Sequence, residues 1–157
     1  MDAQTRRRAP EATRAEIIDM AIEAAAEEGA TGLKLDAVVA RLPFSKGALL
    51  HHFPTKLALL EGVIDHLANE MTAAILAEAA RDPNPYGRNA RAYLRATVNE
   101  PVTERDVSIG RAALVACAVE PSLIARWRTA MRTLAEDDPV DPAGKDDALM
   151  LRLIADG

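Results

Sequence analysis

The stretch PFSKGALLHHFPTK, residues 43–56, decides the fold of this 157-residue chain. Ser45 is suited to cap a helix, because its side-chain oxygen can accept a hydrogen bond from a free amide of the first turn. Lys46 and Gly47 follow directly, so that turn carries a cation beside a residue with no side chain. The pattern predicts a short helix whose first turn another molecule can approach closely.

Helical spacing divides this segment into two faces. Leu49 and Phe53 are four residues apart and are expected to point into a small core. Lys46 and Leu50 lie on another face, with His51 beside them. A helix that enters a DNA major groove needs such a face at its N-terminal turn, although a solvated helix that carries Lys-Gly fits the spacing equally well.

The two adjacent histidines, His51 and His52, raise the question of a metal site. Neighbouring positions on a helix point about 100° apart, whereas two ligands on one face need a spacing of four. His66 is distant in sequence, and no Cys-x-x-Cys, Gly-rich phosphate loop or Gly-x-Ser-x-Gly elbow occurs. We therefore expect no metal, no cofactor and no enzymatic activity.

The residues before this stretch have the spacing of two more helices. The first runs from about residue 11 to residue 28 and is stopped by Gly29. The second spans about residues 35–42, with Val38, Val39 and Leu42 inward, and a turn at Leu42-Pro43-Phe44 follows. Two short helices joined by such a turn, after a longer helix, predict a helix-turn-helix.

Downstream of this motif, the sequence again predicts only helices. Prolines follow acidic or asparagine residues at six places, where they suit helix starts or linkers. Aromatic residues make up only 3 % of the chain and β-branched residues do not alternate, so no strand is expected. The protein is predicted to be all-α, with helices at about residues 55–80, 85–98, 104–119 and 121–136 and a last segment from near Pro142.

Composition narrows the class of protein further. Cys117 is the only cysteine, so no intrachain disulfide can form. No apolar run approaches the roughly 20 residues of a membrane span, and no signal sequence is evident, so a cytoplasmic protein is expected.

The net charge of −5 at first argues against nucleic acid, but it is unevenly distributed. Residues 1–56 hold eight basic and eight acidic residues, and the whole excess of acid lies after them. Within the neutral part, Arg6-Arg7-Arg8 forms a basic arm, which is expected either to reach the DNA or to be a solubilising tail. A neutral segment with a basic edge is compatible with DNA binding.

Residues 13–60 resemble the DNA-binding domain of the TetR family of bacterial transcriptional regulators. The matching features are TRAEIIDMAIEAAAEEGATGLKLDAVVA, then FSKGALLHHF, then PTKLALL. The family pattern has a first helix that ends in glycine, a second helix of Ile-Ala type, Val-Ser-x-Gly-x-Leu-Tyr-x-His-Phe, and a lysine three residues after the phenylalanine. The match extends over the order and the spacing of all these parts.

The resemblance implies a function for each matching position. Lys34 and Lys56 occupy positions where the family contacts phosphate, and Lys56 also links the DNA-binding part to the rest of the protein. Lys46, in the groove-facing start of the recognition helix, would donate to a guanine or, alternatively, contact a phosphate. The DNA-binding residues implied in this way are Lys34, Ser45, Lys46, Gly47, Ala48, Leu50, His51, His52 and Lys56.

Three positions depart from the family pattern. Leu50 stands where the family keeps a tyrosine, so an apolar contact, for example to a thymine methyl group, replaces a phenolic contact to phosphate. Leu42-Pro43 replaces the usual Ala-Gly of the turn, and Val39 replaces the small residue of the second helix. The last two leave the angle between the second and third helices open.

The resemblance also divides the chain into two domains. Residues 1–56 would be the helix-turn-helix DNA-binding domain with its basic arm, and residues 57–157 a helical ligand-binding and dimerisation domain. The second would end early for the family, so we expect either a truncated C-terminus or a smaller dimer interface. Candidates for a ligand pocket, although such residues more often form plain core, are Tyr86, Tyr93, Cys117, Trp127 and Met131.

These observations predict a homodimeric repressor that binds a palindromic operator in double-stranded DNA and releases it when a small-molecule effector binds. The alternative from another class is a helical protein–protein interaction module that uses the exposed face of the third helix without DNA. A weaker third alternative is an enzyme with a site between its helices. Steep salt dependence of binding would single out DNA.

Overall fold

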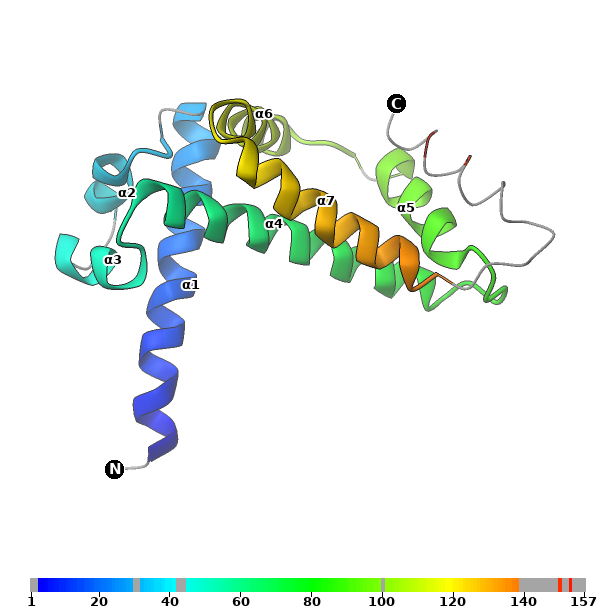
Figure 1. Cartoon of the computed structure of the whole chain (residues 1–157), viewed down its shortest axis with the longest axis horizontal. Coiled ribbons are helices and arrows are strands. Elements are labelled where there is room, and N and C mark those ends of the chain that lie inside the picture. Colours follow the sequence, from blue (N-terminus) through cyan, green and yellow to red (C-terminus); the bar gives the residue numbers. More distant parts are fainter. Residues whose placement is uncertain are drawn as a thin grey trace. The chain divides into compact units, whose positions relative to one another are not determined.

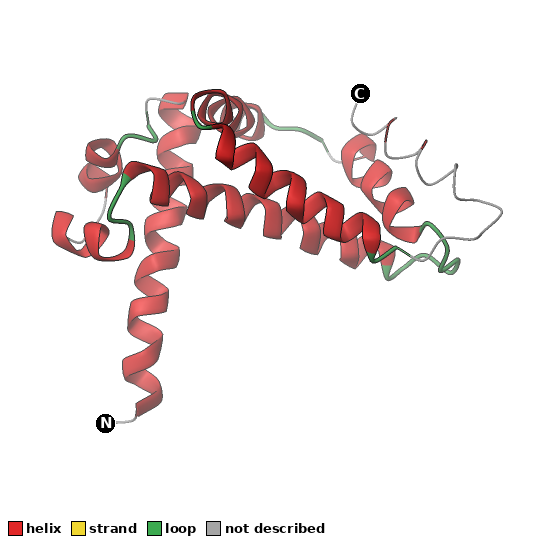
Figure 2. Cartoon of the chain, viewed as in Figure 1, coloured by secondary structure: helices red, strands yellow, loops and turns green. Residues whose placement is uncertain are grey.

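The computed structural model describes residues 3–29, 32–41, 45–99, 101–138, 150 and 153, with side chains from residue 14 onward except that of residue 99. In chain order (Figure 1) the helices are α1 (Ala3–Glu28), α2 (Leu35–Arg41), α3 (Lys46–His52), α4 (Lys56–Ala79), α5 (Arg88–Asn99), α6 (Glu104–Val119) and α7 (Pro121–Glu136). Every regular element in these ranges is a helix (Figure 2), which confirms the predicted fold class. No single described helix is long and apolar enough to cross a membrane; only α6 and α7 counted together pass that test of length and composition.

Most helix ends lie close to their predicted positions, and α6 and α7 agree at both ends. Helix α1 begins at Ala3, earlier than predicted, and includes Pro10, a residue type that disfavours a helix interior; the alanines, glutamine and arginines before it are good helix formers. The predicted arm Arg6-Arg7-Arg8 therefore has a helical backbone, and its side chains lie outside the described part. The predicted turn Leu42-Pro43-Phe44 also lies outside the described residues, as does the segment after Pro142 apart from Met150 and Leu153.

The helices form two compact units. The first unit comprises residues 1–66 and 102–124, and the second comprises residues 67–101 and 125–157. The predicted domain boundary after residue 56 stays a prediction, because each compact unit gathers two separate stretches of chain.

In the first unit, α1 packs against α2, α3 and α6. Its buried face is the apolar stripe that helical spacing predicts, and Gly29 follows the helix with a positive φ of 62°. The buried side chains that close this core include Ile17, Ile18, Ala21, Ile22 and Ala25 from α1, Val38 from α2, Leu49 from α3, and Ile109, Ala112 and Ala116 from α6.

The second unit has a smaller core between the last turns of α4, α5 and α7. Its fully buried members are Ile75, Ala79, Ala92 and Leu134, and Met71, Tyr93 and Ala96 pack against them half-buried. Three of these seven side chains are alanines, so the helices of this unit can approach one another closely.

A candidate DNA-contacting surface and a ligand cavity

Ser45 starts helix α3 in the way the sequence predicts. Its backbone is extended (φ −72°, ψ 155°), and its Oγ accepts a hydrogen bond from the Ala48 amide at 3.3 Å. Leu49 and Phe53 are buried, with 0 % and 1 % of their surface exposed. The opposite face of α3 is therefore left to point away from the core.

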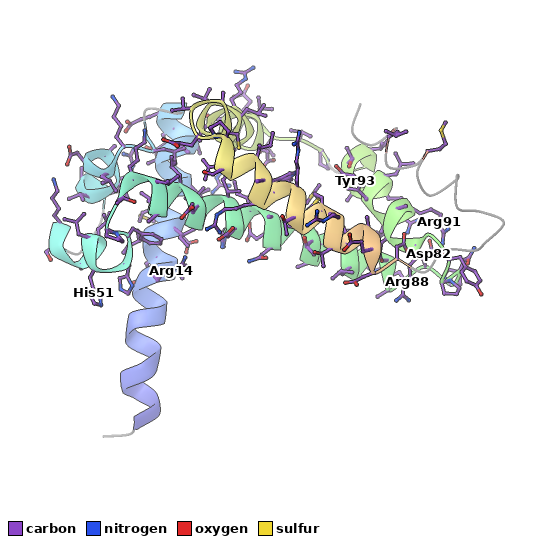
Figure 3. The ribbon with its side chains drawn as sticks, in the orientation of Figure 1. Arg14, His51, Asp82, Arg88, Arg91 and Tyr93 are labelled. Carbon is purple, nitrogen blue, oxygen red and sulfur yellow. The ribbon has the colours of Figure 1, made fainter. Side chains whose placement is uncertain are left out.

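The end of α3 is fixed by the ring of Phe53. The guanidinium of Arg14, from α1 (Figure 3), lies over this ring at 5.0 Å from its centroid, which is a cation–π contact. On the α4 side, a Cβ added to Gly62 would lie only 2.8 Å from Cε1 of Phe53, so the ring's close approach requires a glycine. The sequence analysis identified neither Arg14 nor Gly62 as a support of this helix.

The nine predicted DNA-binding residues are accessible. Seven are exposed, and Ala48 and His52 are half-buried. Leu50, which replaces the family's tyrosine, is 37 % exposed. The rings of His51 (Figure 3) and His52 meet edge-to-face with centroids 5.3 Å apart. The fold thus leaves this set of residues available, while their contacts with DNA stay a prediction.

Gly47 lies in the first turn of α3 and is not required there by the fold. A Cβ added to it would meet only the Ser45 Oγ, at an ordinary 3.6 Å. Glycine inside a helix costs roughly 0.5–1 kcal/mol relative to alanine. Since the packing of α3 does not demand this glycine, a demand from outside the chain, such as the close approach of a partner, is the simpler reason for it.

Lys46 forms an ion pair that the sequence analysis did not foresee. Its Nζ lies 3.0 Å from Oδ1 of Asp36, at the start of α2. Both side chains are largely exposed, 58 % for Lys46 and 87 % for Asp36, and exposed pairs of this kind contribute at most about 1 kcal/mol. A phosphate or a base can therefore replace Asp36 as the partner of Lys46 at little cost.

Two further contacts hold the helices around α3. Arg41, at the end of α2, pairs with Glu27 at 2.6 Å and Glu28 at 2.7 Å, which ties α2 to the end of α1. The hydrogen bond to Glu27 is the largest cause of the raised pKa of Arg41, and the hydrogen bond to Glu28 is the next largest. Thr55 Oγ1 accepts a hydrogen bond from the Ala58 amide at 3.0 Å and so caps the N-terminus of α4. Lys56 therefore lies in a capped first turn.

Helix α6 is attached to the C-terminal turns of α1 by polar contacts. Arg105 pairs with Glu23, and the Ser108 hydroxyl donates to the carbonyl of Ala25 at 3.3 Å. Thr103 and Asp106 form a capping box at the start of α6, and the hydrogen bonds from Thr103 lower the pKa of Asp106.

The second unit contains a cavity of about 300 Å³ between α5 and α7. Tyr93, Trp127 and Met131, three of the five predicted ligand-binding residues, line it. Tyr86 is 48 % exposed in the loop before α5, and Cys117 lies half-buried in α6 of the first unit, where burial raises the pKa of its thiol; neither lines this cavity. The lining residues that the sequence analysis missed are Asn89, Arg128, Arg132, Leu134 and Ala135.

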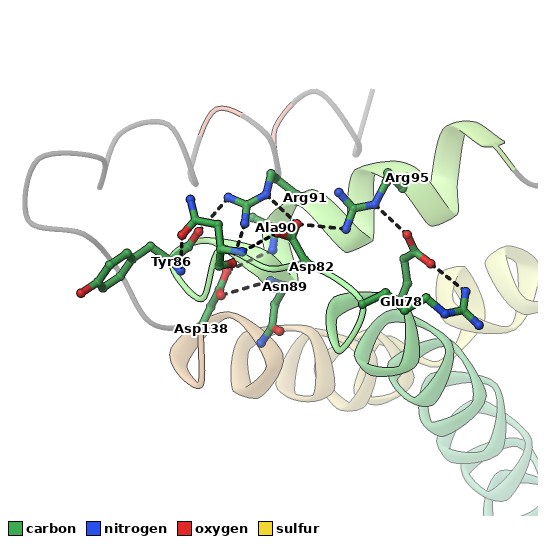
Figure 4. A network of polar contacts seen from close by, with 10 residues as sticks. Glu78, Asp82, Tyr86, Asn89, Ala90, Arg91, Arg95 and Asp138 are labelled. Carbon is green, nitrogen blue, oxygen red and sulfur yellow. Dashed lines mark hydrogen bonds and ion pairs between the residues drawn. The ribbon is translucent and has the colours of Figure 1, made fainter.

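Asp138 joins the two helices that form this cavity. It is 4 % exposed, and its two carboxylate oxygens accept from the amides of Asn89 and Ala90 at 3.1 and 3.0 Å (Figure 4). The Asn89 side chain in turn donates to the carbonyl of Leu134 at 3.1 Å. The start of α5 is thus capped by a residue that follows α7.

The loop before α5 is held by Arg91, and this explains why the helix starts at Arg88 and not at the predicted Pro85. The side chain of Asp82 accepts a hydrogen bond from the amide of Asn84, and the side chain of Asn84 accepts one from the amide of Tyr86. Such hydrogen bonds favour turns over a helix. Arg91 donates to Asp82 at 2.8 Å and to the carbonyls of Asn84 and Tyr86 at 2.8 and 2.7 Å (Figure 4). The hydrogen bond from Arg91 is the main cause that holds the pKa of Asp82 well below its usual range.

Within the described ranges, no three His, Cys, Asp or Glu side chains gather into a group that could hold a metal ion.

Two family models match the chain. The model described as bacterial regulatory proteins, tetR family, matches residues 17–63, from α1 to the first turns of α4. The model described as tetracyclin repressor-like, C-terminal domain, matches residues 87–157. No curated protein matches the chain significantly.

Proposed function

This chain belongs to the TetR family of bacterial regulatory proteins, and from that premise we propose that it is a ligand-responsive repressor that binds a palindromic operator as a homodimer. Membership of this family makes the chain a TetR-like transcriptional regulator with an N-terminal DNA-binding domain. In the proposal, residues 1–56 bind DNA and residues 57–157 bind the ligand and the second subunit.

The observation that carries the proposal is the open first turn of α3. Gly47 has no packing reason to be glycine, and it lies between Lys46 and Ala48 on an exposed turn. A recognition helix needs small residues at this point, because bulk there would hold its backbone away from the floor of the major groove.

The exposed lysines support the same reading of the surface. Lys34 precedes α2 and Lys56 begins α4, and both are exposed. We assign both to phosphates, which fix the position of a protein on DNA without carrying sequence information. Lys46 is assigned to a base or to a phosphate, and the two roles differ in a measurable way.

Two alanine variants separate these roles. Lys56→Ala should weaken binding to every DNA sequence alike. Lys46→Ala should relax the preference at one base pair, by roughly 1–3 kcal/mol, if Lys46 contacts a base. If both variants lose affinity equally on all sequences, Lys46 is a phosphate contact.

The ligand response is assigned to the cavity between α5 and α7, whose lining includes Tyr93, Trp127 and Met131. In the proposal, a small molecule there changes the separation of the two DNA-binding domains and lowers operator affinity, with Lys56 at the start of α4 transmitting the change. Couplings of this kind are typically about 1–3 kcal/mol.

Selection of bound DNA from a random pool tests the proposal. A dimer should enrich a pseudo-palindrome whose half-sites lie about 34–36 Å apart, or a multiple of that spacing. Affinity for the selected DNA should fall steeply between about 50 and 200 mM salt. Failure to enrich any sequence at low salt, or binding that ignores salt, would contradict the repressor and favour a protein-binding module.

A further inference from the structure

The cavity between α5 and α7 has two chemically different walls. Trp127 and Met131 are four residues apart on α7, and Tyr93 faces them from α5. Arg128 and Arg132 form a second stripe, one position further along α7. An apolar, partly aromatic wall thus lies directly beside two guanidinium groups.

The helices around the cavity are strongly basic in an acidic protein. Within their bounds α5 and α7 carry six arginines and one acidic residue, Glu136, although the chain has a net charge of −5. Two of the arginines, Arg91 and Arg95, are engaged with Asp82 and Glu78. This excess of positive charge is what attracts an anion to a site.

The guanidinium groups at the cavity are available to a ligand. Arg128 forms no ion pair with any residue that the structure describes. Arg132 lies 3.7 Å from Glu136, but both side chains are more than two-thirds exposed, so their attraction is weak. Among the described lining residues none is acidic, so the lining offers no carboxylate to pair with a cation, whereas it offers two guanidinium groups to an anion.

We propose that this cavity binds an organic carboxylate with an apolar body, and that Arg128 holds the carboxylate while Trp127 and Met131 hold the body. The inference rests on the proposed function, since it names the chemical class of effector for the same cavity. A guanidinium can donate two parallel hydrogen bonds to a carboxylate, which makes arginine the fitting residue for this anion. A cavity of about 300 Å³ lies at the small end of ligand pockets, so one small molecule fills it.

Three probes of one chain length test the chemistry: octanoate, octan-1-ol and octylammonium, each kept below the concentration at which it aggregates. Trp127 is the only tryptophan, so a change in its fluorescence locates binding at the cavity. Octanoate should bind saturably and at least about tenfold more tightly than octan-1-ol, as a charge-assisted contact requires. Octylammonium should bind most weakly.

A pair of variants on α7 assigns the anion to its partner. Arg128→Gln should lower the affinity for octanoate about tenfold and leave octan-1-ol unchanged. Arg126→Gln removes the same charge from the other side of Trp127 without touching the cavity lining, and should keep octanoate binding within about twofold of the original protein. Far-UV circular dichroism checks that both variants keep their helices.

Three results would overturn the inference: no saturable signal with octanoate, equal affinity for octan-1-ol or octylammonium, or equal losses in the two variants. Operator binding is measured separately on the selected DNA. If the protein binds octanoate but selects no DNA, the carboxylate site stands and the repressor falls. If it selects DNA but binds no octanoate, the repressor stands and this inference falls.

Discussion

Helix α3 and the start of helix α5 differ in where their capping groups come from. The N-terminal turn of α3 is capped by Ser45, whose acceptor lies three residues from the Ala48 amide. The amides at the start of α5 are satisfied by Asp138, which lies 48 and 49 residues further along the chain. A surface held by local contacts can be predicted from sequence, whereas one held by distant contacts depends on the folded structure.

The largest expected effect is at the surface of α3. Gly47→Leu should lower operator affinity about 100-fold, or about 2.7 kcal/mol, because the new side chain holds the helix away from the groove. The fold itself should become slightly more stable, since leucine favours a helix over glycine by roughly 0.5–1 kcal/mol. Gel shifts on selected DNA and thermal unfolding measure the two effects.

Helix α6 supplies a matched control for this variant. Gly110 is also an exposed helical glycine of the first unit, and a Cβ added to it would meet nothing within 4 Å. Gly110→Leu should leave operator affinity unchanged. Equal losses for Gly110→Leu and Gly47→Leu would show that the α3 glycine has no special role in DNA contact.

The next effect is on stability, at the start of α5. Asp138→Ala removes the acceptor for two amides, so it should lower the free energy of unfolding by about 2 kcal/mol, at about 1 kcal/mol for each amide left unsatisfied. Its exposed neighbour serves as control, and Asp137→Ala should stay within about 0.5 kcal/mol of the original protein. Urea denaturation compares the two.

Ser45→Ala completes the comparison between the two caps. The Ser45 cap is exposed, so water can replace it, and the loss should be about 1 kcal/mol. If Ser45→Ala costs as much as Asp138→Ala, burial and distance do not distinguish these two helix starts.

The same distinction separates what the sequence predicted from what it did not. The buried face of α3 and the ends of α6 and α7 follow from helical spacing, from the local cap at Ser45 and from prolines near the helix starts, and these predictions are confirmed. The start of α5 was misplaced by three residues, because its cap is Asp138 and its preceding loop is held by Arg91. Gly62 and Asp36 were also missed, since only the packed helices bring them to Phe53 and Lys46.

Acidification should weaken the α5 region through Asp82. Only 8 % of this side chain is exposed, and its hydrogen bond from Arg91 lowers its pKa in the folded protein. Its stabilising contribution is therefore present above the unfolded value of about 4 and is lost as the pH falls from there towards the lowered folded value. Asp82→Asn should destabilise the protein at pH 7, and the difference should shrink between pH 5 and pH 2.5.

Urea denaturation across that range measures the difference. Arg91→Gln removes the main cause of the lowered pKa, so this variant should lose less stability than the original protein over the same pH range. A constant gap between the Asp82→Asn variant and the original protein at every pH would assign the contribution of Asp82 to its shape and not to its charge.

The smallest expected effect returns to α3, where the ion pair between Lys46 and Asp36 opposes the proposed function. Asp36 neutralises Lys46 in the structure described and places a negative charge beside the proposed DNA-contacting surface. Asp36→Asn should therefore raise operator affinity a few-fold, by less than about 1 kcal/mol, and the gain should fade above about 200 mM salt. The double variant Asp36→Asn with Lys46→Ala has no lysine to free. The part of the gain in operator affinity that comes from freeing Lys46 must therefore disappear. If Asp36→Asn weakens binding instead, the pair orients Lys46 for its contact with DNA, and Asp36 is a positioning residue and not a competitor.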